Sequence, residues 1–152
     1  QRQMCIRDRG KYLYVVMRRS GLRYWADYAK YATEAVFEFV RRREFPQSYS
    51  RLGCAYFFDS EACCRNHFEM DYGEDPEEGA KVGLFQVELE DPAPQYRDMS
   101  LYDLAYEAMS QRQDVEEGFR QARRYFQGGQ TESPMWEILS DKPARAVKRL
   151  EL

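Results

Sequence analysis

The order of strand and helix patterns along the chain is the feature that most constrains its fold. A β-branched and aromatic run at 11–17 predicts a strand, and a long helix pattern follows at 25–43. Near the C-terminal end, two helix patterns occur in succession with no strand between them. A doubly wound sheet requires regular alternation of strands and helices, so this order favours an α+β fold. The expected order is strand 11–17, helix 25–43, strand 52–58, helix 61–70, strand 82–90, helices 101–111 and 115–127, and a hairpin of 135–140 with 144–150.

The helix pattern at 25–43 defines one apolar face. Its apolar residues recur at steps of three and four, the spacing that lines one side of a helix. Thr33 and Glu34 have the character of a second helix start, which allows a bend inside the pattern. Phe45 and Pro46 end it, because proline disfavours helical geometry in the preceding residue. The residues expected on the buried face are Trp25, Tyr28, Ala32, Ala35, Val36, Phe39 and Val40.

Two segments, 71–79 and 91–98, are expected to be irregular. The first is acidic and contains glycine and proline, and the second contains two prolines. Between them, 82–90 alternates apolar with polar residues, so one face of this strand is expected to meet water. Its expected buried face consists of Phe85, Val87 and Leu89.

Composition excludes several classes of protein. A chain of 152 residues suits one domain, which we expect at 10–152, whereas residues 1–9 resemble translated adapter sequence and are expected to be a non-native or disordered leader. The net charge of −3 argues against a protein that coats nucleic acid or anionic membrane by charge alone. No apolar run approaches the roughly 20 residues of a membrane span. A cytoplasmic protein with reduced cysteines is therefore expected.

The segment 50–59, SRLGCAYFFD, resembles the second NAD-binding motif of ADP-ribosyltransferase-like domains. In that motif a glycine at the start of a strand leads to Tyr-Phe, which here are Gly53, Tyr56 and Phe57. The flanking FEFVRRREFPQSYSR and the later RRYFQGGQTESPMWEIL resemble a bacterial and phage domain family of unknown function that is grouped with the same superfamily. The resemblance implies an α+β fold of two small packed sheets with flanking helices.

The resemblance also implies a site. In such enzymes NAD is the substrate and lies between the two sheets, an aromatic side chain of the second motif stacks on nicotinamide, and a carboxylate on a late strand binds the nicotinamide ribose. Glu137 matches the catalytic carboxylate, and it stands between Trp136 and Ile138 in an otherwise apolar strand. A carboxylate facing water or an arginine is the other interpretation of this pattern. The residues implied to bind NAD are Arg18, Ser50, Arg51, Gly53, Tyr56 and Phe57.

Two of these arginines carry specific expectations. The first strand of such enzymes usually holds the cofactor through His or Arg, and this strand contains Arg18 but no histidine. Arg51 has the geometry to bind the NAD pyrophosphate by bidentate hydrogen bonds. For Arg18 and the neighbouring Arg19, the alternative is that both side chains are exposed to water at the end of the strand.

A zinc site is a competing interpretation. Cys63 and Cys64 are four and three residues before His67, so either pair could share a helix face, with Cys54 as a third ligand. The spacing lacks a Cys-x-x-Cys pair, and buried free cysteine is ordinary core material. We therefore expect no metal.

A basic patch with aromatic residues is a further alternative. Charged runs at helix ends are usually solvated, so the sequence does not predict nucleic-acid binding, and tyrosine with arginine is equally typical of protein interfaces. The residues of this patch are Arg41, Arg42, Arg43, Arg120, Arg123, Arg124, Tyr49, Tyr56, Tyr125 and Phe126.

Two functional hypotheses follow. The first is an NAD-dependent ADP-ribosyltransferase-like protein that transfers ADP-ribose to a macromolecular acceptor, either protein or nucleic acid. The second is a noncatalytic binding or interaction protein on the same fold, encoded by a phage or a defence locus.

Overall fold

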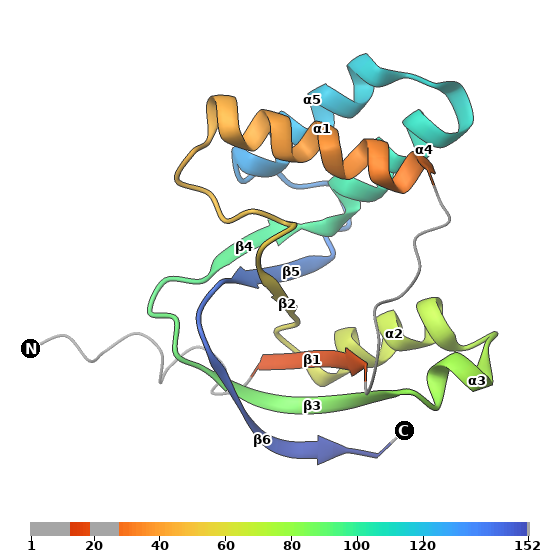
Figure 1. Ribbon diagram of the computed structural model, residues 1–152, viewed down its shortest axis with the longest axis vertical. Coiled ribbons are helices and arrows are strands. Elements are labelled where there is room, and N and C mark those ends of the chain that lie inside the picture. Colours follow the sequence, from red (N-terminus) through yellow and green to blue (C-terminus); the bar gives the residue numbers. More distant parts are fainter. Residues whose placement is uncertain (1–12, 19–27, 152) are drawn as a thin grey trace, which may run out of the picture. The chain divides into compact units, whose positions relative to one another are not determined.

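The computed structural model describes residues 13–18, by their backbone alone, and residues 28–151. These residues form an α+β fold with five helices and two small antiparallel sheets (Figure 1). The leader expected at 1–9 lies outside the described residues. In chain order the elements are β1 (Leu13–Arg18), α1 (Tyr28–Glu44), β2 (Ala55–Phe57), α2 (Glu61–Tyr72), α3 (Pro76–Gly79), β3 (Val82–Leu89), β4 (Gln95–Asp98), α4 (Met99–Arg112), α5 (Val115–Phe126), β5 (Trp136–Ser140) and β6 (Ala144–Leu150).

The described residues divide into two compact units, and each unit is assembled from separate stretches of chain. Unit 1 contains 13–18, 56–94 and 142–151. Unit 2 contains 28–55 and 95–141, and β2 crosses the boundary between the two. The sheets have the strand orders β1-β3-β6 and β2-β5-β4.

Unit 1 is built on the sheet β1-β3-β6, in which β3 is antiparallel to both neighbours. Helix α2 contacts β1 and β3 and supplies Cys64 to a small core with Phe58, Leu84 and Leu150. Its first turn is capped by Ser60, whose Oγ accepts a hydrogen bond from Cys63 N at 3.1 Å. The cap confirms the predicted helix start. Of the residues of α2, Cys64 is the most deeply buried.

The burial of β3 differs from the predicted alternation. Val87 is buried as expected, whereas Phe85 and Leu89 are only half-buried. Val82 and Leu84, on the opposite face, are almost fully buried. The physical reason is that β3 is a central strand whose Leu84 face meets the core around α2, so apolar contacts exist on both faces.

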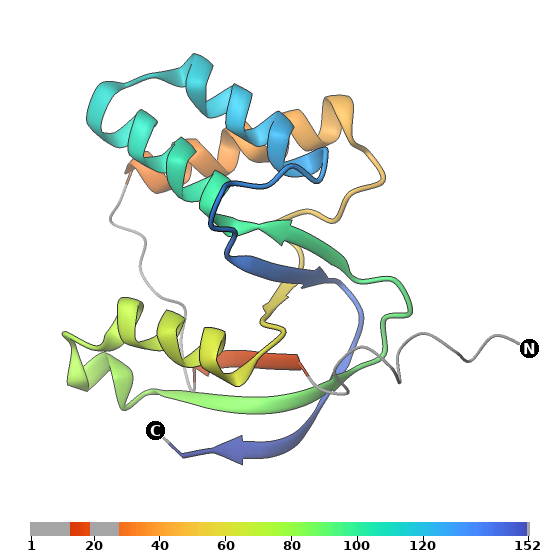
Figure 2. The ribbon, with the colours of Figure 1, turned by 180° about the vertical axis from the view of Figure 1, so that it is seen from behind.

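Unit 2 places helices α1, α4 and α5 together, and α4 continues directly from β4 with α5 beside it (Figure 2). Phe37 of α1 is fully buried among aromatic rings, with its centroid 5.1 Å from Tyr102 and 5.3 Å from Tyr125. Such edge-on ring contacts add to the burial of apolar area. The core of unit 2 is therefore the aromatic interior of this three-helix group.

The buried face of α1 is rotated from the predicted one. Val36 and Val40 are buried as expected, but Phe39 is 54% exposed and Tyr28 is 89% exposed. Buried in their place are Thr33, Glu34 and Phe37. The apolar pattern predicts the wrong face because it assigns every charged residue, including Glu34, to the exposed side of the helix. Thr33 begins no second segment: its Oγ1 donates to Ala29 O at 2.8 Å within one continuous helix, and Trp25 lies outside the described residues.

The predicted hairpin of the last two strands is wrong. β5 pairs with β4, with Arg97 opposite Glu137, and β6 pairs with β3 in the other sheet. The turn residues at 141–143 do form a loop between β5 and β6. A turn in the sequence does not show, however, that the two strands on either side of it pair with each other.

The two segments predicted to be irregular each contain a short element. Gln95–Asp98 forms β4 directly after Pro94, where β5 supplies its hydrogen-bonding partner. Pro76–Gly79 forms α3, because Asp75 caps it by accepting from Glu78 N at 3.0 Å and proline is compatible with a first helical turn.

The limits of α5 agree with prediction. Asp114 accepts from Glu117 N at 3.0 Å at its start, and Gly128, just beyond its end, has the left-handed φ of 78°. Among the described residues, no helix combines the length and the apolar character needed to cross a membrane.

Candidate functional site

Arg51, in the loop between α1 and β2, is the centre of a buried polar cluster within unit 2. Its side chain contacts Glu34 of α1, Tyr102 of α4, Tyr125 of α5 and Glu137 of β5. We call these five residues the Arg51 cluster. Each is at most 9% exposed, which is unusual for Arg and Glu unless they are paired. The cluster therefore joins four elements of one unit through a single guanidinium.

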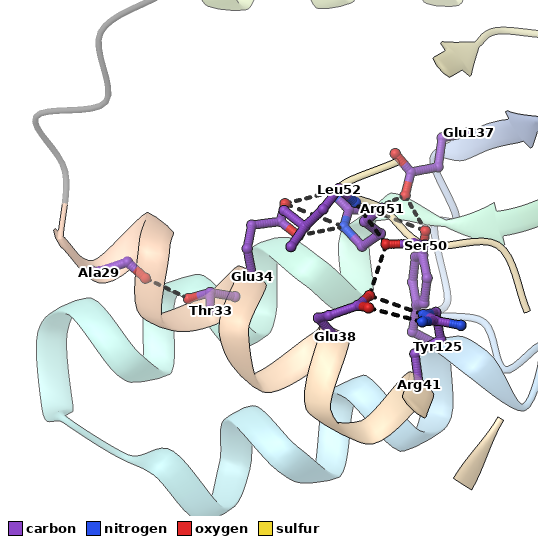
Figure 3. A network of polar contacts seen from close by, with 10 residues as sticks. All are labelled: Ala29, Thr33, Glu34, Glu38, Arg41, Ser50, Arg51, Leu52, Tyr125 and Glu137. Carbon is purple, nitrogen blue, oxygen red and sulfur yellow. Dashed lines mark hydrogen bonds and ion pairs between the residues drawn. The ribbon is translucent and has the colours of Figure 1, made fainter. Parts of the chain in front are cut away.

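Glu34 binds one edge of the guanidinium (Figure 3). Arg51 Nε donates to both carboxylate oxygens of Glu34, at 3.3 and 3.2 Å, and Nη2 donates to Oε1 at 3.2 Å. The planar guanidinium matches a carboxylate in this two-point arrangement, which lysine cannot reproduce. α1 therefore positions Arg51.

Glu137 and Tyr125 bind the other edge. Arg51 Nη1 donates to Tyr125 Oη at 3.0 Å and to Glu137 Oε1 in a very short contact. The Tyr125 hydroxyl in turn donates to the same Oε1 at 2.5 Å. One oxygen of Glu137 thus accepts two hydrogen bonds, while its Oε2 accepts none from the described residues (Figure 3).

Aromatic rings surround the guanidinium. Its Cζ lies 4.2 Å from the ring centroid of Tyr102, 5.4 Å from that of Tyr125 and 5.8 Å from that of Phe37. These distances lie within the range of cation–π attraction, which is stronger in the absence of water. The Tyr102 hydroxyl itself is buried and has no hydrogen-bond partner among the described residues. The ring of Tyr102 therefore packs against the guanidinium of Arg51.

The cluster contains more negative than positive formal charge, because two carboxylates face one guanidinium. Arg97, opposite Glu137 in the β4–β5 pair, adds a second cation nearby. Burial lowers the pKa of Arg97, and its attraction to the charge of Glu137 opposes that shift. Two arginines thus balance the two carboxylates.

The remaining titratable groups of this region are neutral. Burial, followed by the charge of Glu137, raises the pKa of Tyr125 well above its usual value, so its phenol keeps its proton and donates. Burial likewise raises the pKa of the Cys54 thiol to about 12, against the opposing charge of Arg51. A thiol with this pKa is neither a nucleophile nor a ready metal ligand near neutral pH.

Ser50, predicted to bind NAD, has structural partners. Its Oγ donates to Glu38 Oε2 at 2.8 Å and accepts from Leu52 N at 3.2 Å. Glu38 also accepts from Arg41 at 2.8 and 2.9 Å and from Arg42 at 2.7 Å. Hydrogen bonds from Arg41 above all lower the pKa of Glu38 to about 2. This network attaches the Ser50 loop to α1.

The other predicted NAD-binding residues lie in different settings. Gly53 N donates to Ser50 O at 3.1 Å in a turn, and a Cβ there would make only ordinary contacts with Ser50. Tyr56 is half-buried in β2, while Phe57 is 3% exposed. Arg18 is the last residue of β1, and its side chain lies outside the described residues.

The structure brings together Arg51 and Glu137, which are 86 positions apart in the sequence. Sequence reasoning missed Glu34, Tyr102 and Tyr125 as their partners. The sequence pattern indicates a helix start at Glu34 and an exposed ring at Tyr125, whereas both side chains are buried in the structure. The only available signal was a glutamate amid an apolar helix pattern.

The residues considered for zinc are divided between the two units, with Cys54 in unit 2 and Cys63, Cys64 and His67 in unit 1. Cys64 is buried, and burial raises its pKa to about 11. The ring of His67 lies 5.0 Å from Phe58, and its Nε2 lies 3.5 Å from the carboxylate of Asp71. Within the described part of the chain, no three His, Cys, Asp or Glu residues form a group able to hold a metal ion.

The arginines considered for a basic patch are mostly paired with glutamates. Arg41 and Arg42 bind Glu38. In the same way Arg120 binds Glu117 and Arg123 binds Glu44. Phe126 is 5% exposed, so its ring is not a stacking surface. These pairs lower the positive charge that the arginine runs suggest.

Comparison with known proteins gives one result. No curated protein matches the chain at a significant level. Residues 11–151 match the model of a family described as "Protein of unknown function (DUF2441)". The match covers nearly the whole chain, and the chain therefore belongs to this family.

Proposed function

We propose that this chain is an NAD-dependent ADP-ribosyltransferase-like protein that transfers ADP-ribose from NAD to a macromolecular acceptor. In this proposal Glu137 is the catalytic carboxylate, and Tyr56 with Phe57 frames nicotinamide. The resemblance of the 50–59 segment suggests the activity, and the two small antiparallel sheets support the expected ADP-ribosyltransferase-like fold. Fold by itself does not imply function, so the proposal depends on the site.

One observation carries the proposal: Arg51 and Glu137 are in direct contact. Both are implied by the same resemblance, Arg51 through the motif at 50–59 and Glu137 as the carboxylate on a late strand, although 86 positions separate them. Their contact supports the assignment of both to one site. Glu137 also lies on β5, the central strand of its sheet, where its backbone position is well defined.

The two oxygens of Glu137 have different roles in this proposal. Oε1 is held by Arg51 and Tyr125, whereas Oε2 accepts no hydrogen bond from the described residues. A carboxylate oxygen without a donor is suited to accept a hydrogen bond from a ribose hydroxyl. This arrangement leaves one oxygen for substrate while the other fixes the side chain.

The reaction breaks the bond between ribose C1′ and the nicotinamide nitrogen. The electron pair of that bond stays with nitrogen, so the positively charged ring leaves as neutral nicotinamide. The ribose passes through an oxocarbenium-like state, which the negative charge of Glu137 stabilises. A nucleophilic group of the acceptor then bonds to C1′ and loses its proton to solvent. With water as acceptor, the products are ADP-ribose, nicotinamide and a proton.

Nicotinamide release from NAD by the purified chain, with and without cell lysate as a source of acceptor, tests the proposal. We expect release by the native chain and a loss of at least about 100-fold in Glu137→Gln, which removes the charge and keeps the shape. Glu44→Gln is the matched control, because Glu44 forms an ion pair with Arg123 in the same unit but outside the cluster. It is expected to retain native activity.

Two outcomes would contradict the transferase. Release that is equal in the native chain and in Glu137→Gln would remove Glu137 from the chemistry. A native chain that releases no nicotinamide, and whose melting temperature NAD does not raise, would exclude NAD as substrate, because a ligand of the folded state must stabilise it.

The second candidate is a noncatalytic binding or interaction protein on the same fold. The observation that favours it is the burial of Glu137, which is 2% exposed and paired with an arginine whose three nitrogens all have carboxylate or phenol partners. A buried ion pair of this kind is compatible with a purely structural role. On this hypothesis the protein consumes no NAD.

A further inference from the structure

We propose that Tyr125 is a positioning residue for Glu137, acting through its hydrogen bond to Oε1. This inference rests on the proposed function, since it assumes that Glu137 is the catalytic carboxylate. It adds a residue to which the resemblance assigns no role in the NAD site. Tyr125 would touch neither NAD nor the acceptor, and its effect would pass through Glu137 alone.

The geometry of Tyr125 suits this role. Its hydroxyl donates to Glu137 Oε1 at 2.5 Å and accepts from Arg51 Nη1 at 3.0 Å. Arg51 Nη1 also donates to Oε1, so the three groups form a closed triangle (Figure 3). A carboxylate held by two donors on one oxygen cannot rotate without breaking both bonds. The triangle therefore determines where Oε2 points.

The rigidity of Tyr125 comes from its surroundings. The side chain is fully buried, and its ring makes edge-on contacts with Phe37 at 5.3 Å and Phe126 at 5.0 Å. Burial keeps the phenol protonated, so its single proton remains available for Glu137. A buried aromatic donor of this kind orients a functional group better than a mobile surface side chain.

The same contacts give Arg51 an indirect role. All three of its guanidinium nitrogens already donate to Glu34, Tyr125 or Glu137, and its side chain is 8% exposed. A pyrophosphate contact by Arg51 would break this arrangement. We therefore place Arg51 with Tyr125 behind Glu137, where Glu34 holds the opposite edge of the guanidinium.

Tyr125→Phe and Thr33→Val make a matched pair of variants. Both remove one buried hydroxyl of unit 2 and keep most of the side chain's shape, but only that of Tyr125 contacts Glu137, whereas that of Thr33 donates to Ala29 O within α1. We expect Tyr125→Phe to lower kcat for nicotinamide release about tenfold, the effect of one charge-assisted hydrogen bond, with KM for NAD changed less than about twofold. Thr33→Val is expected to change both constants less than about twofold.

Two measurements separate positioning from loss of structure. The rise in melting temperature caused by NAD should be the same in Tyr125→Phe as in the native chain, because a positioning residue does not contribute to substrate binding. In a Glu137→Gln background, Tyr125→Phe should cause no further loss of kcat, since residues that act through one another are not additive.

The outcomes distinguish this inference from the proposed function. A native chain without nicotinamide release would overturn both. An active native chain in which Tyr125→Phe keeps its kcat would overturn the inference alone. Equal losses in Tyr125→Phe and Thr33→Val, or a loss that appears in KM, would also overturn it, because such effects would report general packing.

Discussion

At the scale of single residues, Arg51 is the side chain on which the interior of unit 2 most depends. Removing a guanidinium from water is costly, and its contacts with Glu34 and Glu137 offset that cost. The reverse also holds, because without Arg51 both buried carboxylates would lose the ion pair they share through it. The cluster is therefore stable only as a complete set.

Arg51→Met should lower the free energy of unfolding by about 3–5 kcal/mol, because it leaves buried carboxylates uncompensated. Arg43→Met is the matched control, since Arg43 is exposed and its main described contact is the ring of Phe39 at 5.9 Å. The control should lose less than about 1 kcal/mol. Urea unfolding of both variants measures the difference, and similar losses would show that Arg51 has no special structural role.

At the scale of elements, α1 and the loop that follows it are joined by carboxylates rather than by apolar contacts alone. Glu34 binds Arg51, and one turn later Glu38 binds Ser50 of the same loop. The four-residue spacing places both carboxylates on one side of the helix. The loop therefore has a defined path between α1 and β2.

Glu38 makes the stability of the contact between α1 and the following loop depend on pH. Its folded-state pKa of about 2 lies below the ordinary value of 4.5, so folding favours the ionised form. The stabilisation is complete above the ordinary value and is lost as the pH falls towards 2. Glu38→Gln should lower the free energy of unfolding by about 2 kcal/mol at pH 7, and its difference from the native chain should shrink by pH 3.

Urea unfolding at pH 7, 5, 4 and 3 provides this measurement. Glu44→Gln, which removes an exposed ion pair with Arg123, should show a much smaller difference at every pH. A difference between Glu38→Gln and the native chain that stays constant from pH 7 to 3 would contradict the assigned pKa.

At the scale of the whole molecule, the chain passes more than once between two compact units. The sheet of unit 1 takes β1, β3 and β6 from the beginning, middle and end of the sequence. Unit 2 contains every residue of the Arg51 cluster. The helices that contact α1 are α4 and α5, which also belong to unit 2.

Removal of residues 142–152 tests whether the two units have separate stability. It deletes β6, which leaves one edge of β3 unpaired and removes Leu150 from the core around Leu84. Hydrogen exchange should show lost amide protection along β3 and retained protection in α1. Loss of protection in both elements would show that the units unfold together.

Local signals in the sequence were sufficient for the class of fold and for several element ends. The helices predicted at 61–70 and 115–127 begin where expected, directly after their caps Ser60 and Asp114, and Gly128 follows the end of α5. These features depend on hydrogen bonds between residues a few positions apart, so they are visible in a short window. Glu137 was also identifiable, because a carboxylate in an apolar strand departs from its surroundings.

Only the tertiary structure decided how the distant parts combine. It separated β5 and β6 into different sheets and turned α1 so that Glu34, not Phe39, is buried. It also placed Tyr125 beside Glu137, where the sequence suggested an exposed ring. An apolar pattern assigns each residue either to the solvent-exposed surface or to the apolar core. It cannot predict a buried charge that a residue distant in the sequence stabilises. The sequence by itself therefore determined the longer elements and the candidate carboxylate, whereas the short elements α3 and β4 and the ion pairs around that carboxylate depend on the tertiary structure.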